Sequence, residues 1–290
     1  MNWMKYRPIY FLISALVIGA GTFGYVKWGL RLGVDFTGGA IIEYKIGKDV
    51  GTEELTKAAE EVTQISSVQK TGERNYIFRS GPITAEQKEN LKKSIEKSIA
   101  GNIEELRFEN VGPSIGPDLI KKTIYAIVIA SSAILLWVAF QFKSFKFGVS
   151  AVLAMLHDSL VLLGSFALFG HFFGAEIDFL FVTAMLTILS FSVHDTIVVY
   201  DRIRESQKKY DGSLYELANK ATTETMVRSL NNSFTIIFML VALILLGGTT
   251  VKWFAVALLI GTISGTYSSP FVAVPLLVAW DELQRKIKRD

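Results

Sequence analysis

Cysteine is absent from the 290 residues, and histidine occurs only three times. The chain therefore forms no disulfide bonds, although this absence does not identify a compartment, because oxidising compartments permit disulfides without requiring them. Charge is also missing from long stretches. Half of the residues (50%) are hydrophobic and 20% are charged, and the two classes are segregated along the chain rather than mixed. Such segregation is typical of a membrane protein.

Six runs with little or no charge meet or approach the length of about 20 residues that a membrane-spanning helix needs. They lie at residues 9–26, 123–142, 147–173, 177–200, 230–251 and 253–280. The first run is not expected to be a cleaved signal peptide, because its apolar core is too long and no small-residue cleavage pattern follows it. We predict an α-helical polytopic membrane protein with one span in residues 1–28 and five in residues 119–290.

Lysine and arginine fall on one side of this arrangement. They occur before the first span, between the second and third, in segment 201–228 and after the last span, whereas the opposite short loops have almost none. The positive-inside rule then places both termini in the cytoplasm. Segment 201–228 is the long cytoplasmic connection. We expect a short helix at residues 213–224 to lie on the surface of the lipid bilayer.

Residues 29–118 are predicted to form an extracytoplasmic domain that ends in a hinge. Alternation and turn residues indicate strands at 40–46, 67–71, 76–79 and 103–111, with helices at 52–62 and 84–99. Thr84 and Gln87 have the spacing of a capping box. The order β-α-β-β-α-β indicates an α+β ferredoxin-like fold. It contains no histidine and no glycine-rich phosphate loop, so we expect a docking module, with an inert spacer as the alternative.

Glycines mark both ends of this domain. The first segment, residues 29–39, contains the motif residues Asp35, Phe36, Gly38 and Gly39. Paired glycines permit backbone conformations closed to other residues. The second segment, residues 111–118, contains the motif residues Gly112, Pro113 and Gly116. Its two Gly-Pro pairs predict a turn-rich hinge.

Small residues recur every four positions in the last span. They are Ala257, Gly261, Gly265 and Ser269. A stripe of this kind allows close helix packing. We expect it to pack within the bundle, with a dimer interface as the alternative, and we expect Pro270 and Pro275 to bend this helix.

Ionisable side chains inside the membrane are the candidate functional residues. They are His157, Asp158, His194, Asp195 and Arg228. Asp195 lies about 8 Å inside Tyr200 at the helical rise, and its side chain is too short to reach the headgroups. Intramembrane carboxylates usually serve function. An Asp195–Arg228 pair that opens and closes can take up and release a proton, with arginine as the counter-charge. Snorkelling of a helix end is the structural alternative.

Two catalytic or metal-binding alternatives use the same residues. The two His-Asp dipeptides could supply metal ligands, but adjacent residues point about 100° apart on a helix, so neither dipeptide is suited to chelation. An aspartyl intramembrane protease needs two facing carboxylates, and Asp158 and Asp201 are predicted at different depths. We therefore expect no metal, no cofactor and no enzymatic activity.

Four ordered motifs resemble those of the SecD/SecF family of protein-export membrane subunits. They are residues 33–39, residues 111–116, the pair 157–158 and residues 195–205. The resemblance covers nearly the whole chain. It implies an RND-type membrane fold in the bacterial cytoplasmic (inner) membrane. The family's intramembrane aspartate matches Asp195 and its basic partner matches Arg228, whereas His194 stands where the family usually has asparagine.

The resemblance also implies the partners and the task. These are SecD, the SecYEG channel, YajC and YidC, and an unfolded polypeptide in translocation, with no nucleic acid. The implied function is protein export driven by the proton gradient. A non-energised scaffold or receptor and a small-solute transporter of the RND type are the alternatives, and loss of activity on neutralising Asp195 would distinguish the first from a proton-coupled subunit.

Overall fold

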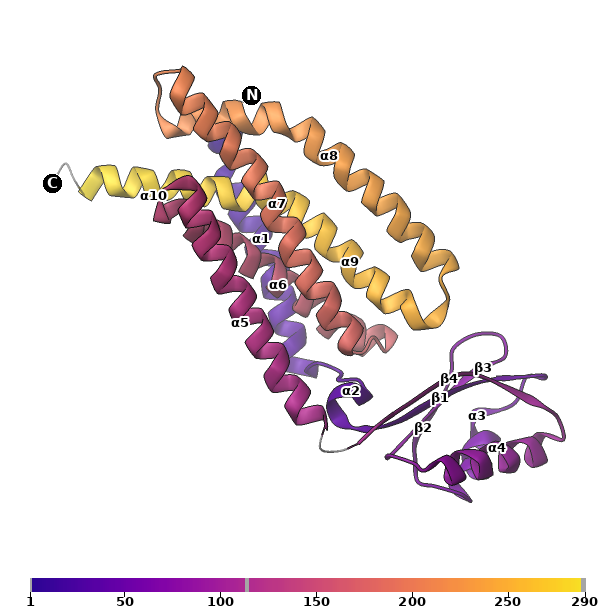
Figure 1. Ribbon diagram of the computed structural model, residues 1–290. Coiled ribbons are helices and arrows are strands. Elements are labelled where there is room, and N and C mark those ends of the chain that lie inside the picture. The colour runs from indigo at the N-terminus through magenta and orange to yellow at the C-terminus, as the bar shows by residue number, and fades with distance from the viewer. Residues whose placement is uncertain (1, 113–114, 288–290) are drawn as a thin grey trace. The chain divides into compact units, whose positions relative to one another are not determined.

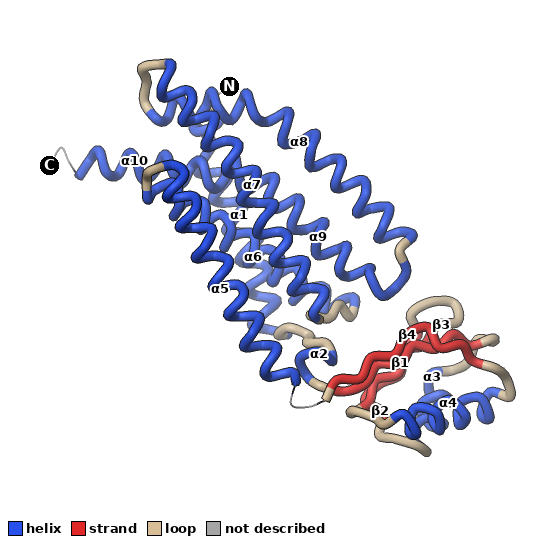
Figure 2. The backbone as a smooth tube through the Cα atoms, viewed as in Figure 1, coloured by secondary structure: helices blue, strands red, loops and turns tan. Residues whose placement is uncertain are grey.

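The computed structural model describes residues 2–112 and 115–287. It divides into two units, one made of Met1–Arg31 with Tyr125–Asp290 and the other of Leu32–Ile124. Figures 1 and 2 show that the strands belong to the second unit and that long helices make up the first. The two units are described separately.

A four-stranded antiparallel sheet forms the second unit, with the order β2-β3-β1-β4. Its elements are α2 (Val34–Thr37), β1 (Gly39–Ile46), α3 (Thr52–Glu60), β2 (Ile65–Lys70), β3 (Asn75–Ser80), α4 (Ala85–Ile99) and β4 (Ile103–Val111). The predicted order β-α-β-β-α-β is therefore confirmed. The Thr84 hydroxyl accepts from the Gln87 backbone and the Gln87 side chain accepts from the Thr84 backbone, so the expected capping box is present.

Alternation along the strands explains the core of this unit. Every second residue of β1, from Ala40 to Ile46, joins a cluster with Leu55 of α3 and Leu91 of α4. Side chains of a strand alternate between faces, so this set lies on the helix-covered face. Two aromatic rings, Tyr44 and Phe78, meet edge to face with their centroids 5.7 Å apart.

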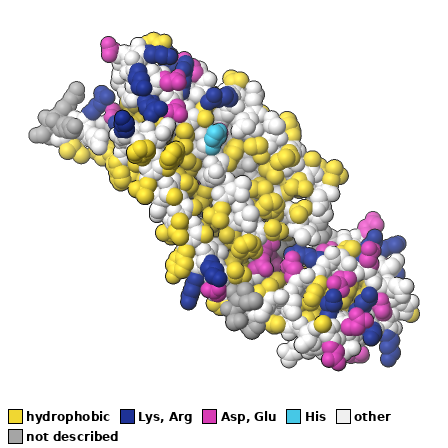
Figure 3. Space-filling model, viewed as in Figure 1, with side chains coloured by type: hydrophobic (Ala, Val, Ile, Leu, Met, Phe, Trp, Pro, Cys, Tyr) yellow, Lys and Arg dark blue, Asp and Glu magenta, His cyan; other side chains and the backbone are white. Residues whose placement is uncertain are grey.

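Within residues 2–112 and 115–287, six helices are long and apolar enough to cross a membrane. The elements that contribute are η1 (Trp3–Tyr6), α1 (Arg7–Trp28), α5 (Ile115–Phe142), α6 (Phe145–Phe173), α7 (Phe179–Lys209), α8 (Leu214–Leu246), α9 (Gly248–Ser268), η2 (Ser269–Ala273) and α10 (Val274–Ile287). The predicted number of spans is confirmed. Large apolar side chains such as Leu16, Trp137 and Phe238 are exposed on their surface, and Figure 3 shows hydrophobic side chains over the visible face of this unit.

The connection between the fourth and fifth spans differs from the prediction. The separate surface helix expected at 213–224 is wrong, because α8 runs without interruption from Leu214 to Leu246 (Figure 1). A capping box between Ser213 and Glu216 starts this helix. No glycine or proline occurs before its end, so nothing in the chain stops it. Together, α7 and α8 form a helical hairpin that extends beyond the apolar runs.

The last span bends where proline was expected to bend it. A π-helical turn, η2, separates α9 from α10 and contains Pro270. Proline removes a backbone donor and widens the helix at this point. Figure 1 shows α10 leaving the direction of α9 after this turn. The bend brings the start of α10 into the bundle core, where Val274 and Leu277 are fully buried.

Candidate functional site in the helical bundle

Asp195 belongs to α7, its side chain faces α8, and it is 5% exposed. It is placed there by the hairpin, since Asp195 precedes the end of α7 by 14 residues and Ser229 follows the start of α8 by 15. The Ser229 hydroxyl donates a hydrogen bond to the Asp195 carboxylate. The side chains of His194 and Arg228 also lie close enough to Asp195 to interact with it electrostatically. The structure thus brings Asp195 and the α8 residues 228–229 together.

Arg228 and His194 differ from Asp195 in their environment. Both side chains are exposed on the surface of the unit. Within the described ranges, neither makes an ion pair with Asp195. Adjacent residues of a helix point about 100° apart, which explains why His194 faces outward while Asp195 faces α8. The site therefore combines a buried carboxylate, one hydroxyl donor and a guanidinium nearby.

Asp158 is the centre of a second polar cluster, on α6. It is completely buried, and its carboxylate accepts hydrogen bonds of 2.6 Å from each of Ser192, Ser264 and Ser268. His157 Nδ1 lies 3.0 Å from the same carboxylate. Three serine hydroxyls of α7 and α9 therefore donate to this side chain, and His157 of α6 lies within hydrogen-bond distance of it. Buried polar groups are stable when they are hydrogen-bonded, and these contacts connect α6, α7 and α9 at one buried side chain.

His157 extends this second cluster to the first span. Its Nε2 lies 3.0 Å from the Ser14 hydroxyl, and Tyr267 of α9 donates to the backbone oxygen of Tyr10 at 2.8 Å. Four of the five predicted residues thus fall into two clusters rather than one polar core, and the fifth, His194, faces outward. One contains Asp195 with Arg228 beside it, and the other contains His157 and Asp158. Both clusters include residues of α7, but within the described ranges no hydrogen bond joins the two carboxylates.

The serines are the functional candidates that the sequence analysis missed. Serine and threonine in helices often bond their own backbone, and Ser150, Ser159 and Ser165 do so here. Residue type alone therefore does not distinguish these serines from those that reach Asp158. The four-residue spacing of Ser264 and Ser268 on one face of α9 was the available signal.

The small-residue stripe of α9 lies against α7. Ala257 is completely buried, a Cβ atom at Gly261 would collide with Ile188, and one at Gly265 would lie 3.2 Å from Ser192 Cβ. The Ser269 hydroxyl is 3.0 Å from that of Thr196. The stripe is therefore used inside the bundle. A second close contact, between Gly21 of α1 and Gly164 of α6, was not predicted.

The two glycine motifs meet in the second unit. Gly38 and Gly39 have φ angles of 72° and 127°, and a Cβ atom at Gly39 would lie 2.7 Å from the Ser80 oxygen. Gly39 pairs with Val111, and Gly116 lies against the backbone of Phe36, which is itself buried. Asp35 lies in the first turn of α2 and Gly112 follows β4. Pro113 lies outside the described residues.

The geometry bears on the two alternatives from the sequence. Among residues 2–112 and 115–287, no group of three or more histidine, aspartate and glutamate residues could hold a metal ion. Asp201 pairs with Arg204 at 3.0 Å, whereas the partners of Asp158 are three serines and a histidine. Within the described residues the two carboxylates share no hydrogen-bond or ion-pair partner, whereas an aspartyl protease requires two carboxylates that act together.

The fold and the site define a polytopic membrane protein with ionisable groups inside its helical bundle and a soluble domain inserted after the first span. Two family models match, SecD/SecF C-terminal protein export membrane protein over residues 91–283 and the SecD/SecF GG motif over residues 29–50. The chain belongs to the SecD/SecF family of protein-export membrane proteins. The recognition of this family from the sequence is confirmed.

Relatives of two lengths are similar to this chain. Protein translocase subunit SecF of Thermobaculum terrenum is 44% identical, over 96% of this chain and 93% of the relative. Protein translocase subunit SecDF of Bacillus subtilis is 30% identical over 98% of this chain, which spans only 38% of that longer protein. The crystal structure of SecDF from Thermus thermophilus, described as a translocon-associated membrane protein, has a TM-score of 0.84 at 30% identity and covers 97% of this chain and 39% of its own.

Proposed function

We propose that this chain is a SecF-type accessory subunit of the Sec protein translocase, which works with SecD and uses the proton gradient to promote late steps of protein export through SecYEG. Names of relatives support the translocase role, and SecDF relatives that continue beyond the matched part support association with SecD. The observation that carries the coupling is the buried Asp195, held by Ser229 in a helical bundle. A carboxylate in this position changes charge when it binds a proton.

In the proposed cycle, Asp195 is ionised while the Arg228 guanidinium lies beside it and takes up a proton when the two separate. Arginine stays charged throughout. Moving one charge through the membrane potential supplies about 2.3 kcal/mol per 100 mV. Asp158 and His157 belong to the same proposed function, as the polar cluster that ties α6, α7 and α9 together. His194 is proposed to contact SecD rather than to carry the proton.

The proposed SecD contact rests on a polar stripe of α7. Thr183, Thr187, Ser190 and His194 are exposed and share one helix face. Polar side chains facing hydrocarbon are unfavourable, and in membrane proteins they commonly make contacts between helices. A second helical bundle of the SecD type covers this stripe in the proposed complex. YajC, YidC and SecYEG are further proposed neighbours.

We propose a bacterial cytoplasmic (inner) membrane location with both termini in the cytoplasm. Lysine and arginine gather at one end of the spans, and three contacts bring the N-terminus, the α7–α8 hairpin and α10 to a common end. Trp3 Nε1 donates to Thr223 at 2.9 Å, Met4 N donates to Asn219 at 2.9 Å, and Arg7 pairs with Glu282 at 2.8 Å. The second unit is then extracytoplasmic. We assign it a ferredoxin-like fold and propose that it contacts the translocating polypeptide.

Substitution of Asp195 tests this function. In inverted membrane vesicles that contain the full complex, Asp195→Asn is expected to abolish the part of export that depends on the proton gradient, while insertion and association with SecD persist. Arg228→Ala should do likewise, and the double variant should be no worse than either single one. Normal gradient-dependent export by a correctly assembled Asp195→Asn protein would instead support a non-energised scaffold.

A further inference from the structure

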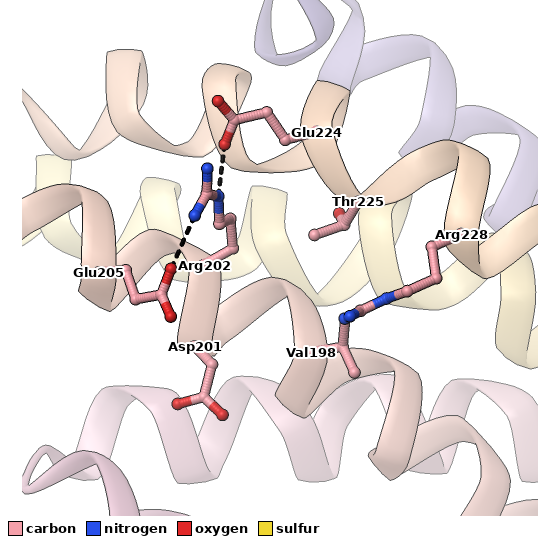
Figure 4. A pocket seen from close by; sticks show the side chains of 7 residues that line it. All are labelled: Val198, Asp201, Arg202, Glu205, Glu224, Thr225 and Arg228. Atoms are coloured by element: carbon pink, nitrogen blue, oxygen red, sulfur yellow. Dashed lines mark hydrogen bonds and ion pairs between the residues drawn. The ribbon is translucent and has the colours of Figure 1, made fainter.

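A pocket of about 440 Å³ opens between α7 and α8 on the cytoplasmic side of Asp195. Figure 4 shows the side chains that line it. Val198, Arg202 and Glu205 come from α7, whereas Glu224, Thr225 and Arg228 come from α8. Most of these groups are charged, so water rather than lipid is suited to fill this space.

The pocket leads towards the carboxylate. Asp195, Val198 and Arg202 are spaced three and four residues apart and therefore share one face of α7. Val198 lies only about 4.5 Å farther along the helix axis than Asp195. Figure 4 shows the Arg228 side chain extending to Val198. The inner end of the pocket is thus formed by Arg228, which lies beside Asp195.

One ion pair crosses the pocket from α7 to α8. Arg202 Nε donates to Glu224 Oε2 at 2.5 Å, and Arg202 Nη1 donates to Glu205 Oε2 at 2.7 Å (Figure 4). Glu205 is on the same helix as Arg202, so that second pair does not connect the helices. Of the two pairs that Arg202 makes, the one with Glu224 joins α7 to α8.

We propose that the Arg202–Glu224 ion pair is a latch that controls access of cytoplasmic water to Asp195. This inference rests on the proposed function, in which the proton leaves Asp195 towards the cytoplasm. The Arg202 and Glu224 side chains are 37% and 34% exposed. Pairs with this much exposure contribute little to stability and are screened by salt, so the latch opens and closes without unfolding the hairpin.

Absence of cysteine allows a direct test, because a single introduced thiol is the only one in the chain. Val198→Cys places a thiol in the pocket, and Asp211→Cys places a reference thiol in the α7–α8 turn. A membrane-impermeant maleimide is added to inverted vesicles that contain the full complex, and the rate of labelling is measured. Since exposed pairs contribute at most about 1 kcal/mol, Glu224→Gln is expected to speed labelling of Val198→Cys by about five-fold.

Two matched variants make the test specific. Glu205→Gln removes the pair within α7 and is expected to leave the labelling rate unchanged. Exchange of the charges, Arg202→Glu with Glu224→Arg, is expected to restore slow labelling, and Asp211→Cys should react equally in every background. Thr225→Cys, on the α8 side of the pocket, replaces Val198→Cys if that variant does not assemble.

The latch is wrong if Glu224→Gln and Glu205→Gln label at the same rate, or if the charge exchange labels as fast as Glu224→Gln. Labelling does not require export, so this outcome is distinct from failure of the proposed function. Asp195→Asn could retain gradient-driven export while labelling still responds to Glu224→Gln. In that case the ion pair controls access to the pocket, and the proposed proton coupling is wrong.

Discussion

Ser229 on α8, the residue that follows Arg228, donates a hydrogen bond to the carboxylate of Asp195 on α7. The sequence pairs Asp195 with the arginine, but the group in direct contact is the serine hydroxyl. A neutral donor orients the carboxylate without neutralising it. The Arg228 side chain, which is exposed, is then free to approach or withdraw during a cycle.

Removal of that hydroxyl should impair coupling. A hydrogen bond to a charged group contributes about 1.5–3 kcal/mol, so we expect Ser229→Ala to lower the initial rate of gradient-driven export by at least about ten-fold. Ser229→Thr keeps the hydroxyl and should retain most of the rate. The measurement is export into inverted vesicles with and without a proton gradient. Equal losses in the two variants would indicate a packing defect instead.

Topology can be tested with reporters. A reporter fused after Gly81 is expected outside the cytoplasm, and one fused after Asp211 inside it, because lysine and arginine gather at the end that contains the α7–α8 turn. Protease accessibility in intact cells and in inverted vesicles shows on which side of the membrane each reporter lies. Two fusions on the same side would contradict the six-span arrangement.

Independent folding is expected for the second unit. Its core is formed by its own strands and helices, including Ile42, Leu55 and Leu91. A fragment of residues 35–108 should therefore show mixed helix and sheet circular dichroism and a cooperative thermal transition. A fragment that stays disordered in buffer, with and without a stabilising osmolyte, would show that the membrane helices are required.

The prediction from the sequence was most accurate where one local pattern decides the structure. Alternation of apolar and polar residues, together with a helix-capping motif, predicted the element order of the second unit. Long uncharged runs predicted the membrane spans. Periodicity specifies which face of a helix is buried but not which partner covers it. The carboxylate cluster of Asp158 was missed for this reason, since Ser192, Ser264 and Ser268 all lie 34 or more residues from Asp158 in the chain. The uninterrupted α8 was missed because polarity suggested a break at residue 228.

Acid should weaken one surface contact of the second unit. Asp49 accepts hydrogen bonds from Lys70 Nζ at 2.6 Å and from the Tyr76 hydroxyl at 2.7 Å. The Lys70 hydrogen bond, followed by that of Tyr76, lowers the pKa of Asp49 below its ordinary value. A lowered folded-state pKa contributes stability that is complete above the ordinary carboxyl pKa of about 3.9 and is lost as the pH falls further.

Asp49→Asn is therefore expected to lower the thermal midpoint of the fragment at pH 7, with the difference from the unchanged fragment narrowing below about pH 4. Lys70→Met removes the other half of the contact, and the double variant should be no less stable than the less stable single one. A difference that stays constant from pH 7 to pH 3 would mean that the ionised contact does not stabilise the unit.

Substitution by asparagine should have different effects at Asp158 and at Asp195: it should lower stability at Asp158 and abolish gradient-driven export at Asp195. Asp158 is completely buried and accepts from Ser192, Ser264 and Ser268, which belong to two other helices. Asparagine has one acceptor oxygen, so Asp158→Asn leaves buried hydroxyls without partners, at a cost of about 1–3 kcal/mol.

For the detergent-solubilised complex we expect Asp158→Asn to lower the thermal midpoint by about 4–8 °C for a loss of about 2 kcal/mol, while some gradient-driven export remains. Asp195→Asn, by contrast, should abolish that export with little change in the midpoint. Within the described ranges Asp195 accepts one hydrogen bond, from Ser229, and does not hold several helices together. Ser264→Ala combined with Asp158→Asn should lower the midpoint less than the sum of the two single effects, since both changes act on one hydrogen bond. Complete loss of export in Asp158→Asn at an unchanged midpoint would assign Asp158 to proton transfer instead of helix packing.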